Sequence, residues 1–113
     1  MTPDEKGYIL FRCDWEPADP PAVEWADALR TWRDRLHRLG LVGVYPNGIG
    51  YGNLSCRPVP GTAFVVTGTG TGGLAALGPE HLTAVTGYDL AGNTVRCRGP
   101  VKASSESLTH AAV

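Results

Sequence analysis

The stretch of residues 64–73 constrains the fold of this chain more than any other. It reads Phe-Val-Val-Thr-Gly-Thr-Gly-Thr-Gly-Gly, so a run of β-forming residues leads directly into alternating threonines and glycines. The uninterrupted apolar run predicts a strand that is covered on both faces. The glycines can adopt positive φ angles, and successive bare amides can face one concavity, which suits a loop that wraps an anion. A flexible turn without a ligand is the alternative that this stretch alone leaves open.

The length and charge of the chain restrict the classes of protein to which it can belong. With 113 residues, it is predicted to form one domain with a single modest core. The net charge is -1, so we expect no broad electrostatic surface for nucleic acid or anionic lipid. No apolar run reaches the length of about 20 residues that spans a bilayer, and the N-terminus does not read as a signal peptide. We therefore expect a cytoplasmic protein without a membrane partner.

The three cysteines, Cys13, Cys56 and Cys97, are far apart in the sequence and include no Cys-x-x-Cys pair. An odd number without metal-ligand spacing argues against a disulfide framework or a zinc knuckle. We expect all three to pack as small apolar residues with free thiols.

An amphipathic helix is predicted over residues 22–39. Apolar side chains recur there at steps of three or four, and this stripe includes Trp32 and Leu39. The arginines, Arg33 among them, fall mainly on the other side and are expected to face solvent. Gly40 is expected to end the helix, because glycine is the preferred residue just past a helix C-terminus.

Strands are predicted on both sides of this helix. Residues 8–15 read as a first strand, and the prolines that follow make a stiff linker within the domain. After the helix, a short apolar segment (41–45) and a glycine-rich turn precede a half-buried strand over residues 53–57. Asn53 and Ser55 fall on one side of that strand, because side chains alternate with a period of two. This pair either lines a pocket, or it caps a turn and faces solvent.

A β-hairpin is predicted in the second half of the chain. Pro79 suits the first turn of a short helix, after which residues 83–90 and 94–98 read as antiparallel strands around a Gly-Asn turn. In the second of these strands, arginines alternate with Val95 and Cys97. The alternation predicts that one face of the hairpin is exposed to solvent and the other is buried.

A second helix is predicted over residues 104–113. Ser104 or Ser105 can serve as its N-cap, and Glu106 lies in the first turn, where the helix dipole favours negative charge. Good capping by itself is the alternative explanation of these residues. The apolar stripe that Leu108 begins has no terminator before the sequence ends, so we expect a chain that is cut short and a stripe that is left uncovered.

Three motifs in this order resemble the N-terminal half of the class II aldolase/adducin family, which includes fuculose-phosphate aldolase. The motifs are Gly52-Asn53-Leu54-Ser55, Val66-Thr67-Gly68-Thr69-Gly70 and Ala103-Ser104-Ser105-Glu106. The resemblance covers roughly residues 22–113 and leaves residues 1–21 as an extra N-terminal strand and proline-rich linker. It implies an α/β/α sandwich with a mostly antiparallel central sheet, formed by residues 1–113 as a single domain that is incomplete at its C-terminus. One departure is Gly68, where relatives often carry proline.

The resemblance also implies roles for individual residues. In the family, the Gly-Asn, Thr-Gly and Ser-Ser elements hold the phosphate of a sugar phosphate, and the glutamate after the serine pair acts as the acid/base beside the reacting carbon. A carboxylate whose pKa is raised by partial burial could remove or return a proton there. Hydroxyls and amides that converge near a helix N-terminus are physically suited to a phosphate. Carried over, the phosphate-binding residues are Gly52, Asn53, Thr69, Gly70, Ser104 and Ser105, and the catalytic residue is Glu106.

The resemblance fails at the catalytic metal. These enzymes hold a divalent metal, usually zinc, through a His-x-His pair after the Ser-Ser-Glu helix and a third histidine further on, and the metal stabilises the enediolate. Here the sequence ends before such a pair, and His37, His81 and His110 are isolated. We therefore expect no metal or other cofactor in this chain.

Two hypotheses about function follow. The first is a truncated class II aldolase-like protein that binds a phosphorylated sugar but is inactive without the missing metal ligands. The second is a non-catalytic binding or oligomerisation module like the adducin head, in which open sheet edges and an uncovered stripe favour a homo-oligomer. A nucleotide-binding P-loop is a poor third, because no Gly-Lys-Ser/Thr follows the threonine and glycine loop.

Overall fold

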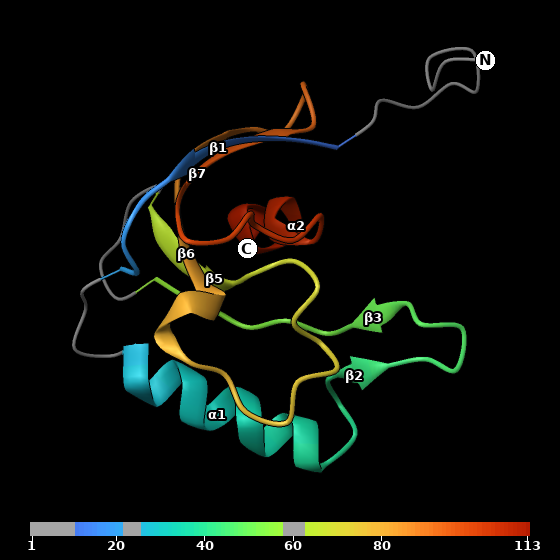
Figure 1. The fold of residues 1–113 in the computed structure, drawn as a ribbon. Coiled ribbons are helices and arrows are strands. Elements are labelled where there is room, and N and C mark those ends of the chain that lie inside the picture. The colour runs from blue at the N-terminus through green and yellow to red at the C-terminus, as the bar shows by residue number, and fades with distance from the viewer. Residues whose placement is uncertain (1–10, 22–25, 58–62) are drawn as a thin grey trace.

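The computed structural model describes residues 11–21, 26–57 and 63–113, which form a mixed α/β fold (Figure 1). No helix in these three ranges is both long and apolar enough to cross a bilayer. In chain order, the elements are β1 (Arg12–Pro17), α1 (Ala26–Arg38), β2 (Gly43–Val44), β3 (Gly50–Tyr51), β4 (Ser55–Cys56), β5 (Phe64–Thr67), a 3-10 turn (Pro79–His81), β6 (Leu82–Asp89), β7 (Thr94–Gly99) and α2 (Ser107–Ala112).

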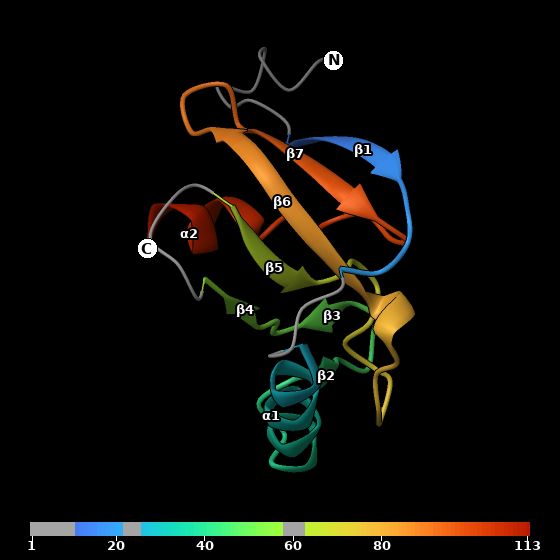
Figure 2. The same cartoon turned by 90° about the vertical axis from the view of Figure 1, so that its left-hand side faces the viewer.

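The main sheet has the strand order β1-β7-β6-β5-β4, and β2 pairs with β3 in a separate hairpin (Figure 2). The pairings β7–β6, β6–β5 and β5–β4 are antiparallel, which confirms the expectation for the central strands. The N-terminal strand differs, because β1 runs parallel to β7 with Arg12 opposite Thr94. The sheet is therefore mixed, and the predicted extra strand is one of its edges.

Strand β5 is buried on both faces, as its apolar run predicts. On one face, Val65 packs with Leu82 and with the first turn of α1 around Ala26. On the other face, Val66 joins a second cluster that includes Ala111 of α2. Because successive side chains of a strand point in opposite directions, the two helices cover opposite sides of the sheet at β5. The coarse α/β prediction is confirmed.

The buried face of α1 differs from the predicted stripe. Residues 22–25 of the predicted helix lie outside the described residues, and the remaining part ends at Arg38. Trp32 is 54% exposed and Leu39 is also exposed, whereas Arg33 is only 1% exposed, so the expected orientation of these three residues is wrong. The reason is that the loop after β5 presents carbonyl oxygens to this side of the helix, and a guanidinium can satisfy several of them at once.

The end of α1 is as predicted. Gly40 has a φ of 78°, its N–H donates to the carbonyl of His37, and the N–H of Leu41 donates to the carbonyl of Leu36. These two bonds form a Schellman motif, in which a glycine adopts the left-handed conformation that other residues avoid.

Strand β1 extends further than predicted. Residues 8–10 lie outside the described residues, and the strand continues to Pro17. Proline is tolerated there because β1 is an edge strand, where no neighbour needs its missing N–H. The indole Nε1 of Trp15 donates to the carbonyl of Gly99 at 2.9 Å, which helps to hold β1 on β7.

The three cysteines are free, but two of them are in contact. The Sγ atoms of Cys13 and Cys97 lie 2.9 Å apart across the β1–β7 pair, although the two residues are far apart in the sequence. Cys97 is buried as expected, whereas Cys13 and Cys56 are half-buried.

The hairpin β6–β7 confirms its sequence pattern. Val95 and Cys97 are buried, and the arginines between and after them are exposed. By contrast, β4 is only two residues long, so the strand predicted over residues 53–57 is shorter than expected. The proline-rich turn at residues 58–61 lies outside the described residues.

Helix α2 begins later than predicted. Its N-cap residue is Glu106, not a serine of the preceding pair, because a turn comes first: the N–H of Ser107 donates to the carbonyl of Ser104. Ala111 is buried, and Leu108 packs against the cluster on β6 and β7. The expectation of an uncovered apolar stripe is therefore wrong.

Candidate functional site

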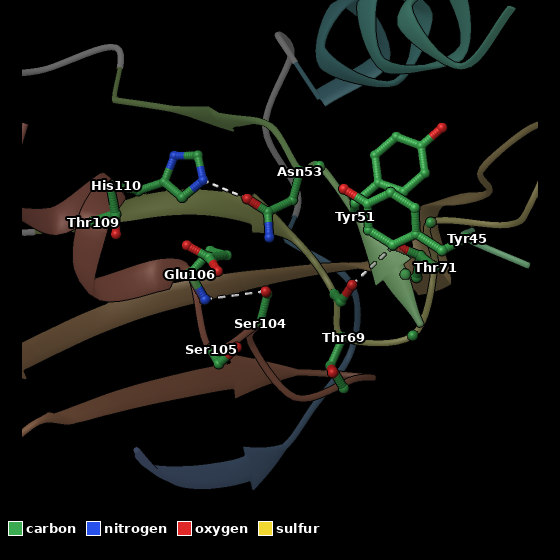
Figure 3. A pocket seen from close by; sticks show the side chains of 15 residues that line it. Tyr45, Tyr51, Asn53, Thr69, Thr71, Ser104, Ser105, Glu106, Thr109 and His110 are labelled. Atoms are coloured by element: carbon green, nitrogen blue, oxygen red, sulfur yellow. Dashed lines mark hydrogen bonds between the residues drawn. The ribbon is translucent and has the colours of Figure 1, made fainter. Parts of the chain in front are cut away.

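The seven residues implied by the resemblance line one pocket. Its volume is about 730 Å³, and its walls come from the segment after β3, the loop after β5 and the turn before α2 (Figure 3). The pocket-lining residues named in the sequence analysis are Gly52, Asn53, Thr69, Gly70, Ser104, Ser105 and Glu106.

Backbone hydrogen bonds fix the start of the loop after β5 and join it to the turn before α2. The N–H of Gly68 donates to the carbonyl of His81 at 2.8 Å, and the N–H of Thr69 donates to the carbonyl of Lys102 at 2.8 Å. Gly68 also forms an isolated bridge with Ala103, the residue before Ser104. These bonds place Thr69 beside the serine pair. They also engage the amides of Gly68 and Thr69, so the expectation that successive bare amides face the anion is wrong for these two.

A close approach of the backbone explains one glycine of the site. Gly52 has a φ of 81°, and a Cβ there would lie 2.7 Å from the carbonyl oxygen of Leu41. Only glycine combines this left-handed conformation with so close an approach. The Gly-Asn motif is therefore needed to bring Asn53 to the pocket.

Arg33 of α1 holds the loop after β5 and is not among the residues that line the pocket. Its guanidinium donates to the carbonyl oxygens of Thr71 at 2.7 Å, Gly72 at 3.3 Å and Leu74. Within the loop, the hydroxyl of Thr71 donates to the carbonyl of Gly68 at 2.8 Å. The threonine and glycine loop is thus held in place by hydrogen bonds and is not an unsupported turn.

The serine pair and the glutamate lie on the wall formed by the turn before α2. The hydroxyl oxygen of Ser104 accepts the N–H of Glu106 at 3.2 Å, which leaves its hydrogen able to point toward a ligand. Glu106 is exposed on this wall, so the expected partial burial of its carboxylate is wrong for the free protein.

His110 is part of the site, and the sequence analysis did not assign it a role. Its Nε2–H donates to Asn53 Oδ1 at 2.5 Å, and the hydroxyl of Ser55 donates to its Nδ1 at 2.7 Å. Burial lowers the pKa of His110 below the ordinary value, and nearby Glu106 partly opposes this shift, so the neutral form of the ring is favoured.

The predicted alignment of Asn53 and Ser55 is confirmed, because both side chains contact the same imidazole. One sequence signal pointed to this group. His110 stands four residues after Glu106, and residues at this spacing share one face of a helix.

The pocket offers neutral hydrogen-bonding groups for the most part. The described lining residues include hydroxyls, an amide and one carboxylate, but no lysine or arginine. At one end, the rings of Tyr45 and Tyr51 lie with their centroids 4.5 Å apart. Such a surface can hold a small polar ligand with several oxygen atoms.

The described residues do not fit the metal site of class II aldolases. In residues 11–21, 26–57 and 63–113, no three His, Cys, Asp or Glu side chains lie together in a way that could hold a metal ion. His81 Nδ1 accepts the N–H of Gly78 at 2.9 Å, and both ring nitrogens of His110 are hydrogen-bonded.

Comparisons with known proteins add no relative. The assignment of a function therefore depends on the three motifs and on the pocket that they form. No protein-family model, no curated protein and no solved structure matches this chain.

Proposed function

We propose that this chain binds the phosphoryl group of a phosphorylated sugar, or of a similar small molecule, in a domain of the class II aldolase/adducin type. One observation carries the proposal. Three motifs that are far apart in the sequence, and that the family uses for phosphate, contribute to the walls of a single pocket. A volume of about 730 Å³ lies in the range of small-molecule sites, which is roughly 300–1,000 Å³.

The chemistry of the pocket suits a phosphoryl group. Phosphoryl oxygens accept hydrogen bonds, and the hydroxyls of Thr69, Ser104 and Ser105 and the amide of Asn53 can donate them. The role proposed for Glu106 is that of an acid/base beside the carbon atoms of the bound sugar. Residues 1–113 contain no His-x-His pair to hold the family's metal, so we expect this chain by itself to bind but not to cleave a ketose phosphate.

A titration followed by NMR tests this proposal. Inorganic phosphate and dihydroxyacetone phosphate should each cause saturable shifts in the three segments, whereas dihydroxyacetone should not. Thr69→Val should weaken binding about tenfold, which is typical of one lost hydrogen bond to a charged ligand. Thr31→Val is the matched control, because Thr31 is exposed on α1. If the unmodified chain shows no saturable shift with millimolar phosphate, the proposal is wrong.

An oligomerisation module is a second candidate, and a separate observation favours it. Several large apolar side chains are exposed in the segment of residues 39–49. So many in so short a stretch are unusual for the surface of a monomer. They are Leu39, Leu41, Val44, Tyr45 and Ile49. We propose that this segment contacts a second copy of the chain, as in an adducin-head-like assembly.

Light scattering at several concentrations tests the second candidate. Ile49→Asp should shift the mass toward the monomer, whereas Leu90→Asp, which changes an exposed leucine in another turn, should not. A monomer at every concentration of the unmodified chain would refute self-association.

A further inference from the structure

We propose that His110 is a positioning residue that turns the Asn53 amide so that its NH2 group faces the ligand pocket. This inference rests on the proposed phosphate site and adds a residue to it. It is carried by a chain of hydrogen bonds, Ser55–His110–Asn53, in which both ring nitrogens are used. The chain joins β4, the segment before it and α2, and two of its members, Asn53 and His110, line the pocket.

The roles of the ring atoms follow from the partners. Asn53 Oδ1 can only accept a hydrogen bond, so His110 Nε2 must carry a hydrogen. In a neutral ring, Nδ1 is then an acceptor, and the hydroxyl of Ser55 is its donor. The acceptor Asn53 Oδ1 thus fixes the tautomer, and Ser55, which is not among the residues that line the pocket, holds the ring from its other nitrogen.

The bond to His110 also determines where the NH2 group of Asn53 points. Because Oδ1 is held by His110, the Nδ2 group points away from the ring and toward the wall that carries Ser104 and Glu106 (Figure 3). An amide turned by 180° would present its oxygen instead, and that oxygen would repel a phosphoryl oxygen. His110 therefore decides whether Asn53 is a donor or an acceptor at the site.

The orientation matters more here than in a site with cationic side chains. The described lining residues include no lysine or arginine, and Glu106 adds a negative charge. Recognition of an anion then depends on neutral donors, and each one that is misdirected removes a larger share of the binding. We expect the loss of the Asn53 donor to raise the Kd for inorganic phosphate by roughly ten- to hundredfold.

A double-mutant cycle tests the inference. The Kd for inorganic phosphate is measured by NMR titration for the unmodified chain, Asn53→Ala, His110→Phe and the double variant. If His110 acts through Asn53, each single change weakens binding to a similar extent, and the double variant is no weaker than Asn53→Ala. Additive effects, or unchanged binding in His110→Phe, would overturn the inference. Thermal unfolding checks that each variant is folded, and His37→Phe is the matched control, because it makes the same change outside the pocket.

Two milder variants keep the test valid if His110→Phe does not fold. His110→Gln retains an N–H donor and should restore most of the affinity, whereas a purely space-filling role would not require a donor. Ser55→Ala lies outside the pocket and should still weaken binding several-fold and shift the side-chain NH2 resonances of Asn53 without any ligand. Normal affinity in Ser55→Ala would contradict the role of Ser55 in holding the imidazole ring. If the unmodified chain binds no phosphate, the proposed function fails first; if it binds and these variants bind equally well, only the role of His110 fails.

Discussion

Replacing Arg33 by alanine should loosen the loop after β5 and destabilise the whole domain. The guanidinium is almost completely buried and donates to the carbonyl oxygens of Thr71, Gly72 and Leu74. It also donates to the carboxylate of Asp34 at 3.3 Å. Alanine at this position removes the guanidinium from all three carbonyl groups, of which that of Thr71 keeps the N–H of Leu74 as a donor, and opens a cavity beneath the loop.

The magnitude follows from the burial and from the bonds that are lost. A single hydrogen bond to a charged group contributes about 1.5–3 kcal/mol, and breaking a buried ion pair by removing one partner costs about 3–5 kcal/mol. The bonds of Arg33 share one side chain and one site, so their contributions do not add in full. We expect Arg33→Ala to lower the free energy of unfolding by about 3–5 kcal/mol, a large part of the 5–15 kcal/mol that is typical of a domain.

Urea unfolding followed by circular dichroism measures this loss. Arg38→Ala is the matched control, because Arg38 is exposed in the last turn of the same helix and should change stability by less than about 1 kcal/mol. Arg33→Lys should lie between the two, since an ammonium group cannot reach the carbonyl oxygens with the same fork of donors. If Arg33→Ala were no less stable than Arg38→Ala, the buried guanidinium would not hold the loop, and this reasoning would be wrong.

Three further predictions concern the backbone, a histidine and a thiol. Gly70 and Gly40 have similar positive φ angles, and a Cβ at either would meet no atom within 4 Å. Alanine at each should lower the free energy of unfolding in urea by about 1–2 kcal/mol. Only Gly70→Ala should also weaken phosphate binding. Burial lowers the pKa of His110 from 6.5, so below that pH the unfolded state binds more protons than the folded state. The free energy of unfolding should therefore fall as the pH drops below about 6.5. His110→Gln should flatten this part of the plot of stability against pH. Burial and the contact with Cys97 raise the pKa of Cys13 to about 12. At pH 8, iodoacetamide should therefore modify Cys13 far more slowly in the folded chain than in urea, as measured by mass spectrometry. Equal rates would contradict the burial of this thiol.

Local patterns predicted the elements whose neighbours are close in sequence. The β6–β7 hairpin and the Schellman end of α1 depend on turn residues and on alternation within a few positions, and both appear as expected. The buried face of α1 was predicted wrongly because charge alone placed Arg33 in solvent. Its partners are carbonyl groups of a distant loop, and no helical pattern contains them.

In the candidate site, too, contacts between distant segments could not be predicted from local patterns. That Asn53, Thr69 and Ser104 share one pocket was predicted only through the order of three motifs, since no local pattern brings these segments together. His110 was passed over because its importance comes from contacts with residues of an earlier strand region. A histidine one helical turn after a candidate catalytic residue is the signal that sequence reasoning can use in such cases.

The parallel pairing of β1 with β7 has a consequence for the order in which this chain folds. Arg12 lies opposite Thr94, so β1 has no partner strand until the distant strand β7 has been synthesised. Closing so large a loop is slow and entropically costly, whereas the β6–β7 hairpin can form as soon as it leaves the ribosome. The N-terminal strand should therefore dock last, onto a hairpin that is already complete.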